Sequence, residues 1–348
     1  MQQELGRTTF GQVGIQKRDK DLWSLGVLPV MMVGAVSGIV GLYWDVAWHV
    51  DKGRDSFFTP PHNFLYGAIA IVLLMSVVAL VRDRRDTPLH LPIGRLRLHP
   101  GVLIVAVGAA LELFFAPADE LWHRLFGPDA TLWAPMHLVG LTGLTLAAFG
   151  SLVSAWVETR LATEPARKRL FALVTLFFAA ILLAWSAVLM AEFEFYIQVF
   201  PTFWHPLLLT GLPAFTLVLM ARLRPLPWAA TLTALGFGAL RLLLAVFLMG
   251  TSALDLAGDT RPLIPVFILA GLAADLLVSR LPAWAVGLAV GATSLLTNWF
   301  LVGTVGLMSW HRGALLVGVP LGLLLACVLG VLGSLAAKAL APKPEART

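Results

Sequence analysis

The chain has 348 residues, of which 58% are hydrophobic and only 13% are charged. Average soluble domains carry about 25% charged residues, so this composition indicates a membrane protein rather than a set of soluble domains. The net charge is +5, but the Lys and Arg residues gather in alternate loops between apolar stretches. That distribution argues against a basic patch for nucleic acid. The one cysteine, Cys327, excludes a disulfide framework and a thiolate metal cluster.

Ten apolar stretches approach the roughly 20 residues that a helix needs to cross a bilayer. They predict an all-α fold, a polytopic membrane bundle of about ten transmembrane helices. The division between the eighth and ninth stretches, at residues 279–282, is the least distinct. The stretches cover about 24–46, 63–82, 101–117, 135–156, 170–191, 205–221, 227–249, 263–279, 283–306 and 314–337.

Loop charge predicts the orientation of the bundle. Lys and Arg are concentrated in the N-terminal segment, in the even-numbered loops and in the C-terminal tail. The positive-inside rule places those segments in the cytoplasm, with both termini inside and the chain in the inner membrane of the cell. We expect a cytoplasmic N-terminal segment, a metal-binding half with four spans, a C-terminal bundle with about six spans and a cytoplasmic tail. These parts are residues 1–22, 23–160, 161–340 and 341–348.

The end of the first apolar stretch carries a candidate metal site. Asp45 and His49 are four residues apart, so they share one face of a helix. His62 follows thirteen residues later, at the start of the second stretch. Two imidazoles and one carboxylate suit a divalent transition metal, and three protein ligands leave coordination positions open. The sequence therefore predicts a metal site at Asp45, His49 and His62.

The same pattern returns further along the chain. Asp119 and His123 repeat Asp45 and His49 at an offset of 74, and His137 repeats His62 at an offset of 75. The repeat predicts two similar helix pairs, 25–82 and 101–156, with a second metal site at Asp119, His123 and His137. Both sites are expected on the outer side of the membrane. Four flanking positions also match, namely Trp48 with Trp122, Gly53 with Gly127, Asp55 with Asp129 and Pro61 with Pro135. Asp55 and Asp129 could accept an imidazole N–H or cap the following turn.

These motifs resemble the copper-binding membrane subunit of the particulate methane monooxygenase and ammonia monooxygenase family, over about residues 25–160. In that family an Arg-Asp-x-x-Phe-Thr-Pro-x-His segment closes a copper site of one Asp and two His. The resemblance implies that Asp45, His49 and His62 bind copper, and that Asp119, His123 and His137 form the family's second copper site. Asp119 stands where the family has Asn, which makes this site more anionic. The resemblance does not extend over residues 170–348.

Three functions follow from this interpretation. The first is activation of oxygen at copper for the oxidation of a small apolar substrate, with companion monooxygenase subunits as partners. The second is non-catalytic copper binding, sensing or transfer, and the third is haem binding or transport. The Asp four residues before a His in both copies argues against haem. Iron and zinc are the alternative metals, and the expected partners also include the lipid bilayer and a second copy of the chain.

Other polar residues within or between the stretches need partners. Arg241 is isolated in the seventh stretch, so a carboxylate partner is expected. Glu112 is seven residues before Asp119, two turns deeper on the same helix face, and could relay protons, accept a hydrogen bond or pair with Arg241. The candidate partners of Arg241 are Glu112, Glu192, Glu194 and Asp275.

Several of the remaining histidines have less specific surroundings. Glu192, Glu194, Tyr196 and His205 are expected to form an outer cluster, where metal binding is the less favoured interpretation. His90 and His99 lie in a loop between two apolar stretches, and we expect both of them to be solvated.

Overall fold

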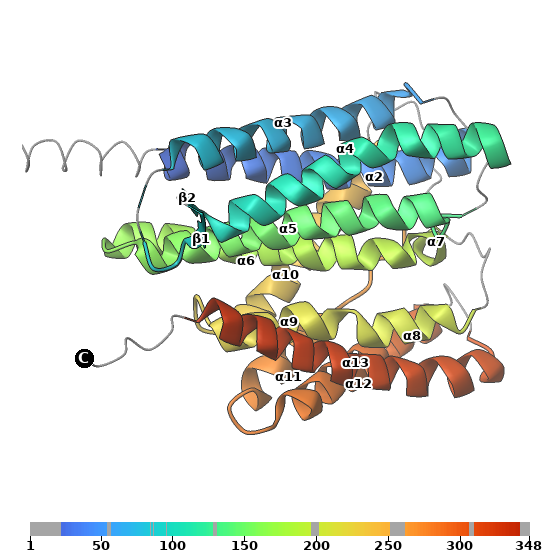
Figure 1. The fold of residues 1–348 in the computed structure, drawn as a ribbon. Helices are drawn as coiled ribbons and strands as arrows, with labels where there is room; N and C mark the ends of the chain where they lie inside the picture. Colours follow the sequence, from blue (N-terminus) through green and yellow to red (C-terminus); the bar gives the residue numbers. More distant parts are fainter. Residues whose placement is uncertain are drawn as a thin grey trace, which may run out of the picture.

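The computed structural model describes residues 22–53, 57–83, 85, 87–94, 96–127, 131–195, 202–250, 262–305 and 310–341. These residues form a bundle of long helices (Figure 1). Within the described parts, nine helices are long and apolar enough to cross a membrane, which makes this a multi-pass membrane protein by the length and composition of its helices. Residues 1–21 of the predicted N-terminal segment and residues 342–348 of the predicted tail lie outside the described residues. The loop positions Arg54, Asp55, Asp129 and Tyr196 lie outside them too.

The helices follow the predicted stretches in chain order. A π-type turn, η1, leads into the first helix, and a 3-10 turn, η2, with the short α7 extends α6. The elements are η1 (Leu22–Val27), α2 (Leu28–Lys52), α3 (Pro60–Arg82), α4 (Pro100–Phe126), α5 (Pro135–Leu161), α6 (Pro165–Ala187), η2 (Val188–Met190), α7 (Ala191–Glu194), α8 (Trp204–Gly211), α9 (Pro213–Leu223), α10 (Ala229–Gly250), α11 (Ile268–Leu277), α12 (Ala283–Val305) and α13 (Arg312–Leu340).

The eighth stretch, predicted as a full span, departs from that expectation. Its helix, α11, has only 10 residues, and residues 262–267 before it are not helical. The Asn298 side chain accepts from the N–H of Val266 at 2.8 Å and donates to its C=O at 2.9 Å. An irregular backbone inside a membrane protein must satisfy its polar groups internally, and Asn298 does this for Val266.

The all-α bundle also carries a short antiparallel hairpin between α3 and α4, which the sequence did not predict. It pairs β1 (Leu91–Ile93) with β2 (Leu96–Leu98). The start of α2 and the end of α13 lie at the same end of the bundle as this hairpin (Figure 1), and we call it the hairpin end. We call Asp45, His49 and His62 the first triad, and Asp119, His123 and His137 the second triad. The opposite end of the bundle, where α2 and α4 finish and α3 and α5 begin, is called the triad end.

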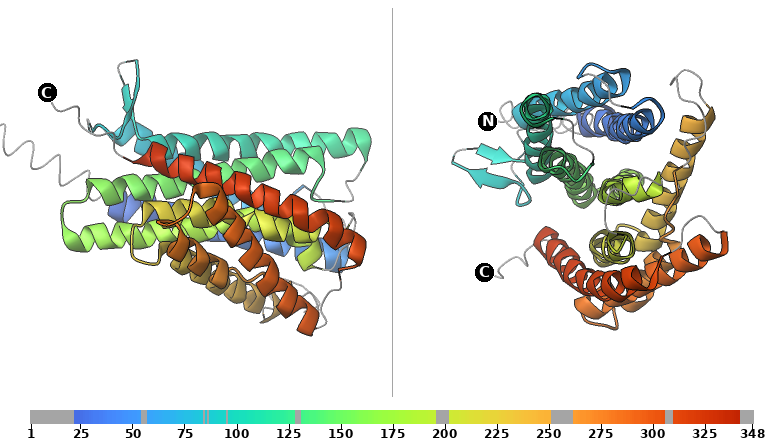
Figure 2. Two further views of the ribbon diagram at one scale, coloured as in Figure 1. Left: turned by 90° about the horizontal axis from the view of Figure 1, so that it is seen from below. Right: turned by 90° about the vertical axis from the view of Figure 1, so that its right-hand side faces the viewer.

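Seen end-on, helices α2 to α4 lie on one side of the bundle and α12 and α13 on the other (Figure 2, right). Helices α2 to α6 pack in sequence order, and α6 also contacts α9 and α10, beyond which α12 and α13 lie. Helices α4 and α5 approach closely because glycines face each other. A Cβ atom built on Gly108 would lie 2.5 Å from the carbonyl oxygen of Gly143, so neither helix could carry a larger residue there without moving apart. The proposed division at residue 160 stays a prediction.

A buried ion pair joins α2, α7 and α10, and it identifies the partner of Arg241. The Arg241 guanidinium donates to the Glu194 carboxylate at 2.7 Å, and the Tyr43 hydroxyl donates to the same Oε2 atom at 2.9 Å. Arg241 also donates to the Tyr43 hydroxyl. All three side chains are buried. Of the four carboxylates that were candidates, Glu194 is therefore the partner, and Glu112 is not.

This ion pair generates a stability prediction. Arg241→Met leaves a buried carboxylate and Glu194→Gln leaves a buried guanidinium, so each change should lower the free energy of unfolding by roughly 3–5 kcal/mol. The double variant should lose clearly less than the sum, because neither charge remains. Unfolding in detergent, followed by circular dichroism, measures all three, with the exposed Arg312→Met as the control. Additive losses would show that the two side chains do not act as a pair.

His90 and His99 are buried, with 3% and 2% of their surface exposed, so the prediction that they are solvated is wrong. The hairpin folds back over the bundle and brings their rings to 5.4 Å from each other. The Arg85 guanidinium bridges two carboxylates beside them, donating to Asp83 at 2.7 Å and to Glu158 at 2.6 Å. The sequence placed these residues in a loop but could not show that the loop covers a helix end.

Burial and charge shift the proton equilibria of this cluster. Burial lowers the pKa of His90 below its usual range, and Asp83 opposes that effect without reversing it. Burial alone would raise the pKa of Asp83, but the hydrogen bonds and charge of Arg85 outweigh it and the pKa is lowered. The folded protein therefore binds fewer protons at both groups than the unfolded chain does.

The sign of these shifts predicts acid sensitivity. Because the unfolded chain binds more protons, the His90 contribution is present above about pH 6.5 and is lost as the pH falls below that value, whereas the Asp83 contribution is lost only below about pH 4. The melting temperature in detergent should therefore drop between about pH 7 and pH 5. His90→Gln, which does not titrate, should flatten that drop. An equally steep drop in His90→Gln would assign the sensitivity to other groups.

Candidate metal centre

Two helix C-termini at the triad end are built alike. Helix α2 ends at Gly53 with φ 77°, and α4 ends at Gly127 with φ 86°. Both values are positive, a region that glycine adopts readily and other residues rarely. The Gly53 N–H bonds the C=O of His49 and the Gly127 N–H bonds the C=O of His123, each at 3.0 Å. Each histidine therefore lies in the last turn of its helix, with its aspartate one turn below.

The returning helices also begin alike. Proline starts both α3 and α5, where its missing N–H leaves no hydrogen bond unmade. His62 and His137 are then the third residue of each helix. Aligning the first residues of the two helices matches Pro135 with Pro60 and not with Pro61. The second copy therefore has its one additional residue in the loop before α5. These shared ends agree with the predicted repeat of two helix pairs, which itself stays a prediction.

The second triad brings its three side chains together. One ligand atom from each of Asp119, His123 and His137 can be chosen so that all lie within 4.8 Å of one another. His123 Nδ1 is 3.5 Å from Asp119 Oδ2, and His137 Nε2 is 3.7 Å from Asp119 Oδ1. The three side chains are partly buried at the triad end. This cluster could hold a metal ion.

A hydrogen bond orients one of these imidazoles. His137 Nδ1 lies 3.0 Å from the carbonyl oxygen of Thr131, and a carbonyl can only accept, so Nδ1 carries the proton. In the neutral ring Nε2 then has the lone pair, and Nε2 is the atom nearest to Asp119. A backbone carbonyl that fixes the tautomer in this way is a common support for metal-binding histidines.

Glu192 supports this arrangement from a distant part of the chain. Its carboxylate accepts from the Thr131 hydroxyl and from the Leu132 N–H, each at 2.6 Å. The segment that bonds His137 is therefore held by α7. The sequence predicted a different role for Glu192, in an outer cluster with His205, and contained no signal that pointed to Thr131.

The rest of that predicted outer cluster is separate. His205 is buried, stacks on Phe193 with ring centroids 4.9 Å apart, and has its Nδ1 atom 3.0 Å from the Trp310 indole nitrogen. The indole N–H donates to Nδ1, because indole is a donor only. Glu194 is bonded to Arg241 instead. The described residues of the cluster therefore do not form a group of three metal ligands, although Glu194 and His205 line one small cavity.

The first triad is assembled differently. Asp45 Oδ1 lies 3.0 Å from His62 Nε2 and 3.6 Å from His49 Nδ1. His49 Nδ1 is closer to the backbone carbonyl of Asp45, at 2.8 Å, so it donates its proton there. A metal at this position would have to bind His49 through Nε2, because Nδ1 carries the proton. The His49 side chain is also 40% exposed. Asp45 therefore contacts both histidines, but the first set is less closely arranged for a metal than the second.

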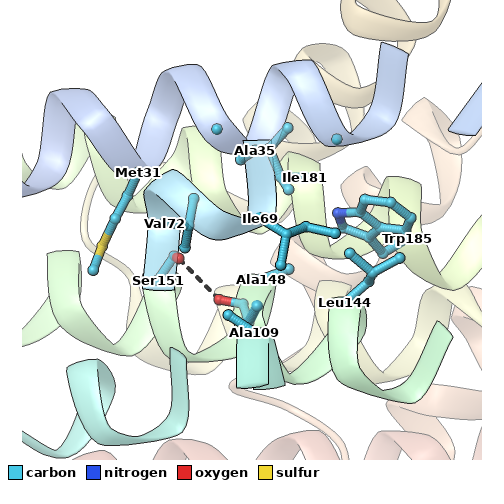
Figure 3. A pocket seen from close by; sticks show the side chains of 13 residues that line it. Met31, Ala35, Ile69, Val72, Ala109, Leu144, Ala148, Ser151, Ile181 and Trp185 are labelled. Atoms are coloured by element: carbon cyan, nitrogen blue, oxygen red, sulfur yellow. Dashed lines mark hydrogen bonds between the residues drawn. The ribbon is translucent and has the colours of Figure 1, made fainter. Parts of the chain in front are cut away.

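An apolar cavity of about 30 Å³ lies among α2 to α6. Aliphatic side chains and Trp185 surround it, and the Ser151 hydroxyl at its wall donates to the Ala147 carbonyl at 2.8 Å (Figure 3). Gly38, which also lines it, is seven residues before Asp45, so the cavity begins about two helical turns below the first triad. An apolar cavity stays free of water and can accept a small apolar molecule.

Comparison with known proteins does not assign the chain to a family. No protein-family model, no curated protein and no solved structure matches the chain.

The carboxylate of the second triad generates a binding prediction. Asp119→Asn keeps the shape of the side chain but removes the negative charge that offsets a divalent ion. It should lower metal affinity at the second triad by about 100-fold, or about 2.7 kcal/mol. Titration with a divalent metal, followed by calorimetry, measures this in a His49→Ala background that disables the first triad. Asp51→Asn, a change beside the first triad, is the control. Unchanged affinity in Asp119→Asn would show that Asp119 is not a ligand.

Proposed function

We propose that this chain is a metal-binding membrane protein whose two Asp/His/His sites face the outer side of the cell's inner membrane, and that the metal is copper. The observation that carries the proposal is the close approach of Asp119, His123 and His137. Two neutral imidazoles and one carboxylate fit copper, and they leave coordination positions for a further ligand. Iron and zinc accept the same donors, so the choice of copper rests on the sequence resemblance.

The orientation is part of the proposal. Basic side chains gather at the hairpin end, which the positive-inside rule places in the cytoplasm. The triad end would then face outward. The described basic residues of the hairpin end include Arg82, Arg85, Arg97, Arg160, Arg167, Lys168, Arg169 and Lys338.

We propose further that the protein works as the copper-binding membrane subunit of particulate methane and ammonia monooxygenases does. Copper bound at the triads would supply one-electron chemistry for oxygen activation. The chain itself would hold the ion through Asp45, His49 and His62 and through Asp119, His123 and His137. The apolar cavity supports this proposal, because it offers space for a small apolar molecule that reaches the site from the bilayer. Companion subunits would bind at the lipid-facing helices.

One experiment tests the metal assignment. We expect copper in the purified protein to fall by about half in His49→Ala and in His123→Ala, and to fall to background in the double variant. His311→Ala, at an exposed histidine away from both triads, is the matched control. The metal is measured by mass spectrometry after growth with copper, iron and zinc supplied together. Equal copper in all variants would contradict the assignment, and an absorption band typical of haem would favour the haem alternative.

A further inference from the structure

Glu112 is a buried acid that takes no part in the ion pair between Arg241 and Glu194. Only 2% of its surface is exposed, and its Oε2 atom accepts no hydrogen bond within the described part of the chain. Arg241, which could have neutralised it, binds Glu194. A charged carboxylate in an apolar span without a partner is strongly disfavoured, so this position needs a further explanation.

The carboxyl group of Glu112 lies directly beneath the second triad. Glu112 is seven residues before Asp119 on α4, which places it two turns, about 10 Å, deeper on the same face. A Cβ atom built on Gly140 would lie 2.8 Å from Glu112 Oε2, so the carboxyl group rests against the backbone of α5. Gly140 is three residues after His137. Both helices that supply the triad therefore contact Glu112 about one to two turns below it.

The first helix pair has no acid at the corresponding position. The offset of 74 that relates Asp45 to Asp119 pairs Gly38 with Glu112. Gly38 lines the apolar cavity. The small and the large residue of a nearby contact are also exchanged between the two helices of each pair. In the first pair Gly41 of α2 contacts Leu65 of α3, whereas in the second pair the large residue, Phe115, is on α4 and the glycine, Gly140, is on α5. The second pair thus makes room for a carboxyl group that the first pair lacks.

We propose that Glu112 is the proton-exchanging group of the second metal centre, holding a proton while the triad is empty and releasing it when a divalent ion binds there. The O–H bond of the carboxyl group breaks, its electron pair stays on the carboxylate, and the proton passes to the solvent buffer. The metal keeps its oxidation state. This inference rests on the proposed metal binding at Asp119, His123 and His137.

The charges around Glu112 support this coupling. Asp119 on its own helix repels a second negative charge while the triad is empty. Between residues 138 and 157, α5 carries no titratable side chain, and its nearest one is His137. Between residues 63 and 81, α3 carries only Tyr66. A divalent ion changes the charge of the triad from −1 to +1. Each unit of that change, about 10 Å away at an effective dielectric constant near 20, shifts the proton equilibrium by about tenfold or more.

Proton counting tests the proposal without any activity assay. Zinc is titrated into the detergent-solubilised protein by calorimetry, in buffers of different ionisation enthalpy, which gives the number of protons released per ion. The His49→Ala change confines binding to the second triad. Within that background, the protein with Glu112→Gln is compared with the protein that keeps Glu112. The His123→Ala background confines binding to the first triad, where Gly38 stands, and serves as the matched control.

We expect Glu112→Gln to release about one proton fewer per ion at the second triad and to leave the count at the first triad unchanged. Infrared difference spectra should also show a carboxylic acid band that disappears on zinc binding and is absent from Glu112→Gln; this measurement on the unsubstituted residue stands even if Glu112→Gln fails to fold. Equal proton counts with tight binding in both proteins, or no change in the acid band, would overturn the role of Glu112. No zinc binding in either background would instead overturn the proposed function.

Discussion

The requirement that a buried polar group be satisfied inside the bundle governs this structure. Arg241 can lie among apolar helices only because Glu194 and Tyr43 bind it, and that contact ties α2 and α7 to α10. Glu192 holds the segment before α5 for the same reason, since its carboxylate accepts from Thr131 and Leu132. Because Thr131 in turn bonds His137, the position of the second triad depends on a contact between the two halves of the chain.

Residues close in sequence could be predicted, because helix geometry relates them directly. The spacing of Asp45 and His49, and of Asp119 and His123, placed each pair on one helix face near a helix end, and the structure has both pairs there. The apolar stretches gave the order of the helices for the same reason. The short α11 escaped prediction because hydropathy measures apolar character, and the non-helical residues before α11 are apolar too.

Contacts between distant segments could not be predicted in this way. Four carboxylates were candidates for Arg241, and only the folded arrangement, in which Arg241 bonds Glu194, selects one of them. His90 and His99 were expected in solvent because a loop gives no sign of folding back on a helix end, and their burial depends on the hairpin between them. The hydrogen bonds of His49 and His137 were also invisible, because the spacing of residues along the chain does not show which backbone carbonyl an imidazole will meet.

The two triads have the same kinds of residue at nearly the same spacing, but their surroundings differ. In the second triad, His137 has its tautomer fixed by the carbonyl of Thr131, which lies outside its helix. Below the first triad lies an apolar cavity, and below the second lies the carboxyl group of Glu112. An apolar cavity can accept an uncharged molecule, and a buried acid can store a proton. Two helix pairs thus share one pattern of Asp and His, while the residues one to two turns below that pattern give each triad a different chemical environment.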